Sequence, residues 1–319
     1  MDLGIVIVNW NVRDLLAKCL DSVYADLAAS AGRLAGQVIV VDNGSTDGSA
    51  EMLRARFPDT PLIQAENGGM GGGNNLGLKQ LGFGLPPGGQ HPPGAALILN
   101  PDTVVRPGAL LALVNFLRAR TRAGVAAPKL LNPDGTLQHA GFRFPGVVQM
   151  ALDLYPPPGR LSRLAQSPLN GRYPAARYAA GRPFAVEHTL GAAFAVRAEA
   201  MAECGLFDEA FPMYCEEIDW QWRLARAGWE RWIVPEAEVV HYGGQSTAQV
   251  RAASFRHLWL SRRKLYERYH SPAMLRVLSP LVRSAMERRL RQPQPAEMQS
   301  ALRDIILAWQ PPRQRAGGR

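Results

Sequence analysis

The stretch Ala95-Ala96-Leu97-Ile98-Leu99-Asn100-Pro101-Asp102-Thr103 decides the expected fold. Five apolar residues of strand length are followed at once by polar side chains and by a proline that ends the strand. In open α/β sheets, ligands bind just beyond the carboxyl ends of the strands. A carboxylate placed there can hold a divalent cation against a diphosphate, and the same four polar residues also suit a plain turn.

Strand and helix patterns alternate along the first 130 residues. Apolar stretches predict strands at 3–9, 37–41, 61–64 and 95–99. Apolar residues at helical spacing predict helices at 13–27, 45–57, 72–81 and 107–120. Such repeated units predict an α/β fold with a mostly parallel central sheet flanked by helices.

The organisation of the chain is expected to be uneven. Residues 1–250 are assigned to the α/β domain, and 145–183, rich in Pro, Gly, Arg and Tyr without a period, to a loop insertion within it. Residues 251–310 are helical in pattern and basic, and 311–319 are expected to be a disordered tail. Regular structure resumes after the insertion at 186–196, 216–227, 231–234 and 239–241.

The net charge of +9 belongs to the C-terminal part of the chain. Residues 251–319 carry 15 Lys and Arg against 4 Asp and Glu, which leaves 21 against 23 for the first 250 residues. This basic extension suits an anionic membrane surface, or it packs as a pair of helices on the α/β domain. The near-neutral remainder and the lack of any nucleic-acid motif argue against a nucleic-acid partner.

The apolar stretches and the cysteines favour a cytoplasmic protein. No apolar stretch reaches the roughly 20 residues of a spanning helix, and the first residues have the pattern of a strand rather than a signal peptide. Cys19, Cys204 and Cys215 are too few and scattered for a disulfide framework or a zinc site. We expect a cytoplasmic location, peripheral on the inner face of the cell membrane if the basic helices bind lipid.

Polar residues cluster where the first two strands end. Asn9 and Asn11 follow the first strand, and Asp42, Asn43 and Ser45 follow the second. Because parallel strands end at the same edge, these side chains can surround the base and ribose of a nucleoside. They also suit a turn before a helix cap, and the two interpretations are compatible.

Residues 67–75, NGGMGGGNN, hold five glycines in six residues. No Gly-Lys-Ser/Thr follows, so this is not a P-loop, and Asn74 stands where a dinucleotide fingerprint needs its third glycine. Asn67, Gly71 and Asn74 favour a loop that faces a diphosphate or sugar, with a plain flexible loop as the alternative.

Two further groups carry titratable side chains. Glu216, Glu217 and Asp219 open an amphipathic helix, where acids favour the helix dipole. Neighbouring tryptophans supply apolar surface that can raise the pKa of a carboxylate toward that of a general base. His241 ends a strand before a Gly-Gly turn, which places it to join Asp102 on a metal.

In this order the motifs resemble those of family 2 nucleotide-sugar glycosyltransferases with the GT-A fold, most closely a bacterial rhamnosyltransferase-like branch. Any one segment is weak, but seven in the same order are specific, and together they span residues 3 to about 247. The matching segments are 7–11, 40–49, 67–77, 99–103, 191–197, 205–219 and 241–246.

The resemblance implies roles for individual residues. Asn100-Pro101-Asp102 matches the family's Asp-x-Asp metal motif, with Asp102 as the retained acid and His241 as the second ligand of Mg²⁺ or Mn²⁺. Asn100 replaces the first acid of that motif. Glu217 matches the general base, one methylene longer than the usual Asp, with Asp219 as the rival base and Glu216 beside it. The implied donor-binding residues are Asn9, Asn11, Asp42, Asn43, Ser45, Asn67, Gly71, Asn74, Asn100 and Asp102.

The implied activity is an inverting, metal-dependent sugar transfer. The donor would be a dTDP- or UDP-linked sugar, L-rhamnose or another hexose, and the acceptor a hydroxyl of a saccharide or lipid-linked molecule in cell-surface polysaccharide biosynthesis. A non-catalytic carbohydrate-binding relative would lose the carboxylates that this chain keeps. A sugar nucleotidyltransferase would carry a Gly-rich segment with Arg after the first strand, where this chain has Asn9-Trp10-Asn11-Val12-Arg13.

Overall fold

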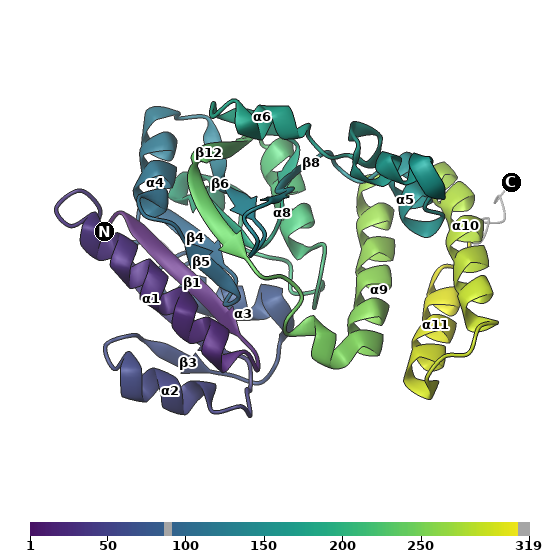
Figure 1. Ribbon diagram of the computed structural model, residues 1–319, viewed down its shortest axis with the longest axis horizontal. Helices are drawn as coiled ribbons and strands as arrows, with labels where there is room; N and C mark the ends of the chain where they lie inside the picture. The colour runs from purple at the N-terminus through teal and green to yellow at the C-terminus, as the bar shows by residue number, and fades with distance from the viewer. Residues whose placement is uncertain (86–90, 312–319) are drawn as a thin grey trace, which may run out of the picture. The chain divides into compact units, whose positions relative to one another are not determined.

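The computed structural model describes residues 1–85 and 91–311, which form two compact units (Figure 1). The sheet unit comprises Met1–Phe144, Arg172–Pro212 and Glu216–Ser246. The helical unit comprises Pro145–Gly171, Met213–Cys215 and Thr247–Arg319. Of the expected disordered tail at 311–319, residues 312–319 lie outside the described residues.

A mixed sheet forms the core of the sheet unit. Its strand order is β3-β2-β1-β4-β11-β6-β12-β5. The strands are β1 (Leu3–Asn9), β2 (Gly36–Asp42), β3 (Leu62–Gln64), β4 (Ala95–Leu99), β5 (Thr103–Val105), β6 (Ala123–Leu131), β11 (Ala193–Arg197) and β12 (Glu230–His241). The short strands β7 (Leu137–Gln138) and β9 (Phe184–Val186) pair with β6 and β12, while β8 (Gly141–Phe142) and β10 (His188–Thr189) pair with each other.

The first half of the sheet is parallel, as the alternating pattern predicts. β1 pairs in parallel with β2 and β4, and β2 with β3, whereas β11 enters antiparallel between β4 and β6. Each of the seven residues of β1 is buried. The expected α/β fold is therefore confirmed, with antiparallel strands added beyond β4.

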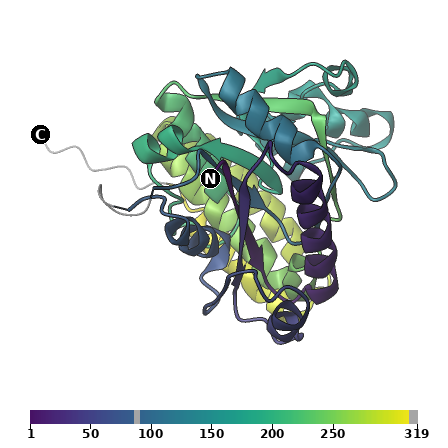
Figure 2. The same ribbon diagram turned by 90° about the vertical axis from the view of Figure 1, so that its left-hand side faces the viewer.

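Helices cover both faces of this sheet. On one face α1 (Arg13–Ala29) contacts α2 (Ser49–Arg56) and α4 (Ala109–Ala119), and Figure 2 shows α1, in purple, lying beside the strands. On the other face α8 (Glu216–Arg226) contacts α3 (Gly69–Gln80) and α7 (Ala198–Cys204). The chain runs outward from β1 to β3 and returns to β4, so the topological switch point lies between β1 and β4.

The glycine-rich segment, expected as a loop, is largely helical. Helix α3 begins at Gly69, so most of the glycines belong to its first turns. A Cβ on Gly73 would lie 2.7 Å from a methyl of Val8, and one on Gly77 would lie 2.5 Å from a methyl of Val6. The glycines therefore allow α3 to pack closely on β1, a cause that the sequence alone does not reveal.

Other predicted elements also differ from the structure. The helix expected at 45–57 is α2, which begins only at Ser49, after Gly48 with φ +81°. The strands expected at 231–234 and 239–241 are one strand, β12, whose pairing with β6 shifts register between Val234 and Glu238. Pro235 lies in this interval and has no N–H to donate, which explains the irregularity. The helix expected from residue 107 begins later, at Ala109, after Gly108 with φ +85°.

The helical unit has a core of its own. Its helices are α5 (Val147–Leu154), α9 (Arg251–Tyr269), α10 (Pro272–Leu290) and α11 (Ala296–Ala308). Trp259 and Trp309 are buried together, and the indole N–H of Trp309 donates to the Trp259 carbonyl at 3.0 Å. Among the described residues no helix is both long and apolar enough to cross a bilayer.

The segment expected as a loop insertion, 145–183, contains short helices. α5 and the 3₁₀ turns Gly159–Gln166 and Pro168–Asn170 belong to the helical unit, and α6 (Ala175–Ala179) belongs to the sheet unit. Residues 147–154 are apolar along one side, and Met150 and Leu154 are buried in the core of the helical unit. Tertiary packing therefore orders part of a segment that has no long period in its sequence.

Candidate active site

The carboxyl ends of β1 and β2 carry a buried polar cluster. The parallel register places Asn9 beside Asp42. The Asn9 amide donates to Asp42 Oδ1 at 3.0 Å and to Ser45 Oγ at 3.1 Å, and the Ser45 hydroxyl donates to Asp42 Oδ1 at 2.5 Å. These bonds fix the turn that follows β2.

Exposure separates the residues of this cluster into two groups. Asn9 and Asp42 are 0% and 1% exposed, so in this structure they hold the turn from inside. Asn11, with φ +53°, donates its backbone N–H to Ser45 Oγ at 3.0 Å and accepts from the Thr46 N–H at 2.7 Å. Asn11 and Ser45 are half-buried, and Asn11 lines a pocket of about 340 Å³. Of these four residues, Asn11 and Ser45 are therefore the ones that keep some exposure to solvent.

The asparagines of the glycine-rich segment lie at and inside the start of α3. Asn43 Nδ2 donates to the Gly69 carbonyl at 3.0 Å, and the exposed Asn67 accepts from the Gly69 N–H at 3.1 Å. Gly71 lies in the first turns of α3, and Asn74 is buried with 3% exposure. The structure thus brings Asn43 and Asn67 together and places Asn74 in the interior.

A pair of candidate metal ligands forms where β4 ends. β12 pairs antiparallel with β5, which places His241 opposite Thr103, the neighbour of Asp102. His241 Nε2 lies 3.3 Å from Asp102 Oδ1, and both residues are buried. Nε2 is within ion-pair distance of this carboxylate but makes no hydrogen bond to any residue that the structure describes.

This geometry fits a divalent cation. Two ligand atoms at right angles around Mg²⁺ or Mn²⁺, each about 2.1 Å from the ion, are about 3 Å apart. Within residues 1–85 and 91–311 no group of three or more His, Cys, Asp and Glu residues could hold a metal. The protein can therefore supply Asp102 and His241, and the remaining positions would fall to ligand oxygens or water.

Asn100 occupies the position that an acid has in the usual motif. Its backbone N–H donates to the Ala192 carbonyl at 2.8 Å, and its own carbonyl accepts from the Thr103 hydroxyl at 2.7 Å. Its side-chain Oδ1 is buried and has no partner among the described residues. Asn100 thus offers a neutral acceptor beside the carboxylate of Asp102.

Two adjacent carboxyl groups open α8. Burial raises the pKa of Glu217 to about 7. Burial, followed by the charge of Glu217, holds the pKa of Glu216 well above its ordinary value. Oε2 of each residue lacks a hydrogen-bond partner within residues 1–85 and 91–311. At neutral pH the pair therefore retains a proton, and Glu217 can give up and take a proton near pH 7.

A short segment before β11 links the acid pair to the candidate metal ligands. A Cβ on Gly191 would lie 3.3 Å from Glu217 Cγ, so the Glu217 side chain lies directly against this backbone. The next residue, Ala192, accepts the Asn100 N–H. Glu217 and the strand end that carries Asp102 therefore lie against two successive residues, Gly191 and Ala192.

Asp219, the rival base, has a different environment. It is 0% exposed, and its Oδ2 accepts from Arg223 Nε at 3.1 Å. The same guanidinium donates to the carbonyls of Cys204 and Leu206. This ion pair holds α8 against the end of α7, which gives Asp219 a structural role.

Two glutamines near the site were not predicted from the sequence. Gln221 Oε1 accepts from the Thr189 N–H at 2.7 Å, and Gln221 Nε2 donates to the Thr189 carbonyl at 3.1 Å. Gln138 Oε1 lies 2.7 Å from His241 Nδ1. Their partners are 32 and 103 residues away in the chain, and no local pattern marks either glutamine.

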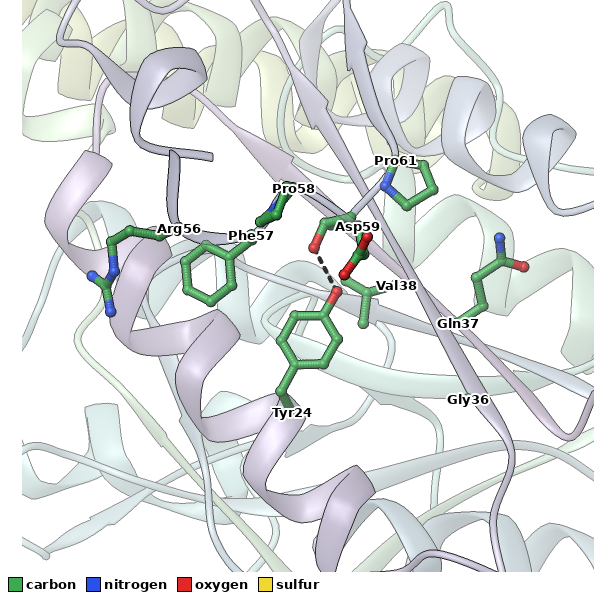
Figure 3. Close-up of a pocket in the computed structure, with 10 residues that line it drawn as sticks. Tyr24, Gly36, Gln37, Val38, Arg56, Phe57, Pro58, Asp59 and Pro61 are labelled. Atoms are coloured by element: carbon green, nitrogen blue, oxygen red, sulfur yellow. Dashed lines mark hydrogen bonds between the residues drawn. The ribbon is translucent and has the colours of Figure 1, made fainter. Parts of the chain in front are cut away.

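A separate pocket of about 410 Å³ lies at the other end of β2 (Figure 3). It is lined by residues such as Tyr24, Arg56 and Asp59, and the Tyr24 and Thr60 hydroxyls are hydrogen-bonded at 2.5 Å. Gly36, the first residue of β2, is also in its lining. Because Asp42 ends the same strand, this pocket is remote from the candidate active site.

The chain matches known sequences over most of its length. Residues 2–259 match the model of a family described as "Glycosyltransferase like family 2". An N-acetylglucosaminyl-diphospho-decaprenol L-rhamnosyltransferase of Mycobacterium tuberculosis is 31% identical over 215 residues, which cover 66% of this chain and 68% of that protein. The low-salt glycan biosynthesis hexosyltransferase Agl10 of Haloferax volcanii is 25% identical over 70% of this chain and 62% of its own length.

Solved structures support the fold. GalNAc-T7, solved with UDP, GalNAc and Mn²⁺, superposes with a TM-score of 0.55 at 13% identity, over 96% of this chain and 54% of that protein. The mannosyltransferase PcManGT of Pyrobaculum calidifontis, solved with GDP-Man and Mn²⁺, superposes with a TM-score of 0.50 at 15% identity, over 96% and 69%. This chain thus spans about half the length of the first protein and about two thirds of the second.

Proposed function

Since the chain belongs to glycosyltransferase family 2 and has the GT-A fold, we propose that it transfers L-rhamnose or another hexose from a dTDP- or UDP-linked donor to a hydroxyl group. The acceptor is a saccharide or a lipid-linked molecule of cell-surface glycan synthesis, as the names of the mycobacterial and archaeal relatives suggest. The observation that carries the proposal is the convergence of Asp102, His241 and Glu217 at the carboxyl edge of the sheet.

The donor nucleotide would occupy the switch point of the sheet. Asn11 and Ser45 present polar surface beside it, where β1 and β2 end, and Asn9 and Asp42 hold that turn through hydrogen bonds. Asp102 and His241 would hold Mg²⁺ or Mn²⁺ against the diphosphate. When bound, this cation supplies positive charge that stabilises the departing nucleoside diphosphate. Mn²⁺ accompanies the nucleotide in both solved relatives, which supports the assignment.

Glu217 is the proposed general base. Its Oε2 has no hydrogen-bond partner among the residues described, and its pKa of about 7 lets it accept the proton of an acceptor hydroxyl at neutral pH. As the hydroxyl oxygen loses its proton, it attacks the anomeric carbon on the side opposite the diphosphate. The bond between that carbon and the diphosphate breaks, so a single displacement inverts the configuration. Asp219 is paired with Arg223, and we assign it a structural role. Glu216 keeps its proton, so Glu216 and Glu217 together carry at most one negative charge.

The test is a screen of dTDP- and UDP-sugars with the purified full chain. With the correct donor and Mn²⁺ we expect a rise in Tm, because a ligand at 100 times its Kd stabilises the folded state by about 2.7 kcal/mol. NMR of the product formed with an isoprenyl-diphosphate-linked saccharide should show the inverted anomer. If no donor raises Tm and no product forms, the proposed function fails, and a retained anomer would refute the single displacement.

We also propose that the helical unit binds an anionic membrane surface. On α11, Arg303 and Leu307 are both exposed and one turn apart, and on α10 exposed Arg276 precedes exposed Val277. Leu161 of the same unit is 60% exposed. Exposed cations beside exposed apolar side chains suit a surface of acidic headgroups and acyl chains.

Vesicle sedimentation measures this interaction. We expect the protein to bind vesicles that contain phosphatidylglycerol and to bind vesicles of phosphatidylcholine alone only weakly. The double variant Arg276→Glu and Arg303→Glu should lower the affinity at least 10-fold, because each cation near the surface contributes about 1 kcal/mol to binding. The exposed Arg33 of the sheet unit provides the control, because Arg33→Glu should leave binding unchanged. Equal binding by the double variant would refute the surface.

A further inference from the structure

The second ring nitrogen of His241 points to an ordered set of hydrogen bonds. His241 Nδ1 lies 2.7 Å from Gln138 Oε1, on the short strand β7. Gln138 Nε2 donates to Asn132 Oδ1 at 3.0 Å, and Asn132 Nδ2 donates to Thr136 Oγ1 at 2.9 Å. The Thr136 hydroxyl donates to Asp134 Oδ1 at 2.6 Å. We call these residues of the β6–β7 hairpin, from 132 to 138, the hairpin relay.

Asp134 determines the direction of every bond in this relay. The Thr136 hydroxyl lowers the pKa of Asp134, which therefore carries an ionised carboxylate that only accepts hydrogen bonds. The hydroxyl of Thr136 must then donate its hydrogen to Asp134. Toward Asn132 its oxygen can therefore act only as an acceptor, so Asn132 presents its amide N–H to it. Asn132 is left with its carbonyl facing Gln138, whose amide donates to it. The remaining atom, Gln138 Oε1, faces His241 as an acceptor.

An acceptor at this position determines the tautomer of the imidazole. Nδ1 must carry the hydrogen that Gln138 Oε1 accepts, so in the neutral ring Nε2 has a lone pair. Nε2 lies 3.3 Å from Asp102 Oδ1 and has no hydrogen-bond partner within the described part of the chain. Two electron-rich atoms at this distance repel each other unless a cation or proton lies between them.

From this geometry we propose that Gln138 is a positioning residue, which holds His241 in the Nδ1–H tautomer so that Nε2 is presented to a divalent cation on Asp102. The inference rests on the cation role in the proposed function. β7 pairs with β6 through Leu130 and Gln138, which fixes the glutamine beside the ring. Loss of such a supporting hydrogen bond typically lowers metal affinity 10- to 100-fold.

The experiment compares Gln138→Leu with Gln138→Glu. Nitrogen-15 NMR of the metal-free protein distinguishes protonated from unprotonated ring nitrogens, and the His241→Asn variant identifies the signals of His241 among the six histidines. The wild type should carry its hydrogen on Nδ1. Gln138→Leu should give a mixture of tautomers, and Gln138→Glu should restore the Nδ1–H form because its carboxylate also accepts from Nδ1.

The second measurement is the affinity for Mn²⁺ alone, followed by electron paramagnetic resonance of the free ion. We expect Gln138→Leu to raise the Kd about 10- to 100-fold and Gln138→Glu to recover most of the loss. Gln37→Leu makes the same chemical change at the remote pocket and should leave the Kd unchanged. Thermal unfolding of each variant separates loss of affinity from loss of fold.

Three outcomes decide between the inference and the proposed function. A hydrogen on Nε2 in the wild type overturns the inference even if the enzyme is active. An unchanged Kd in Gln138→Leu, with the tautomer altered, also overturns it. If the wild type has the Nδ1–H tautomer but binds no Mn²⁺, the result supports the claim that Gln138 holds the His241 tautomer. The same result refutes the proposal that a divalent cation takes part in the function.

Discussion

Asp102→Ala is expected to lower kcat/KM for sugar transfer by about 10³-fold, because charge stabilisation of the leaving group is often the largest single contribution to such a rate. Asp102 supplies the carboxylate of the ligand pair, and Asn100 supplies no compensating charge. The backbone carbonyl of Asp102 would still accept the Tyr242 N–H, so the fold around the site should persist. Initial rates at saturating Mn²⁺ measure the effect.

The matched control is Asp59→Ala, which removes an exposed carboxylate at the remote pocket. It should retain the wild-type kcat/KM and the wild-type affinity for Mn²⁺. The variant Asp102→Ala should lose Mn²⁺ binding together with activity, and His241→Gln should weaken both. Full activity of folded Asp102→Ala would mean that the leaving diphosphate is stabilised elsewhere in the protein.

The strand ends could be predicted because they depend on local sequence. An apolar run that ends in Asn9 or in Asn100 shows where a buried strand stops, and parallel pairing then places such ends at one edge. The end of a later strand likewise indicated His241 as the partner of Asp102, the resemblance implied the same pair, and the two lie 3.3 Å apart. Local pattern and family motif together therefore predicted the location of the candidate site.

Other features depend on packing between distant segments. The glycines of α3 have the composition of a loop, but Gly73 and Gly77 are required by contact with β1. Gln138 follows an ordinary turn, and its partner His241 is 103 residues away. Asp219 and Arg223 stand at helical spacing in the sequence, but the local pattern does not show that the Asp219 carboxylate is buried.

Glu217→Gln is expected to abolish transfer, with kcat reduced about 10²- to 10⁴-fold, the range that general base catalysis contributes. In the wild type kcat/KM should rise with pH through about 7, because Glu217 must lose its proton before it can act as a base. The variant should still gain Tm from the donor and Mn²⁺, since the amide leaves the candidate nucleotide and cation residues intact. Initial rates between pH 5.5 and 9 measure both effects.

The same raised pKa predicts that Glu217→Gln gains stability at alkaline pH. Because burial makes the folded state bind this proton more tightly than the unfolded chain does, the wild type loses stability as pH rises from about 4.5 through about 7. The amide introduced by this substitution carries no charge and does not titrate. Urea unfolding at pH 8 should therefore give the variant a free energy of unfolding about 1–3 kcal/mol higher than that of the wild type. At pH 5 the difference should be smaller. Glu236→Gln, at an exposed site, should change neither value. An active variant with wild-type stability at both pH values would show that Glu217 is ionised without cost and is not the base.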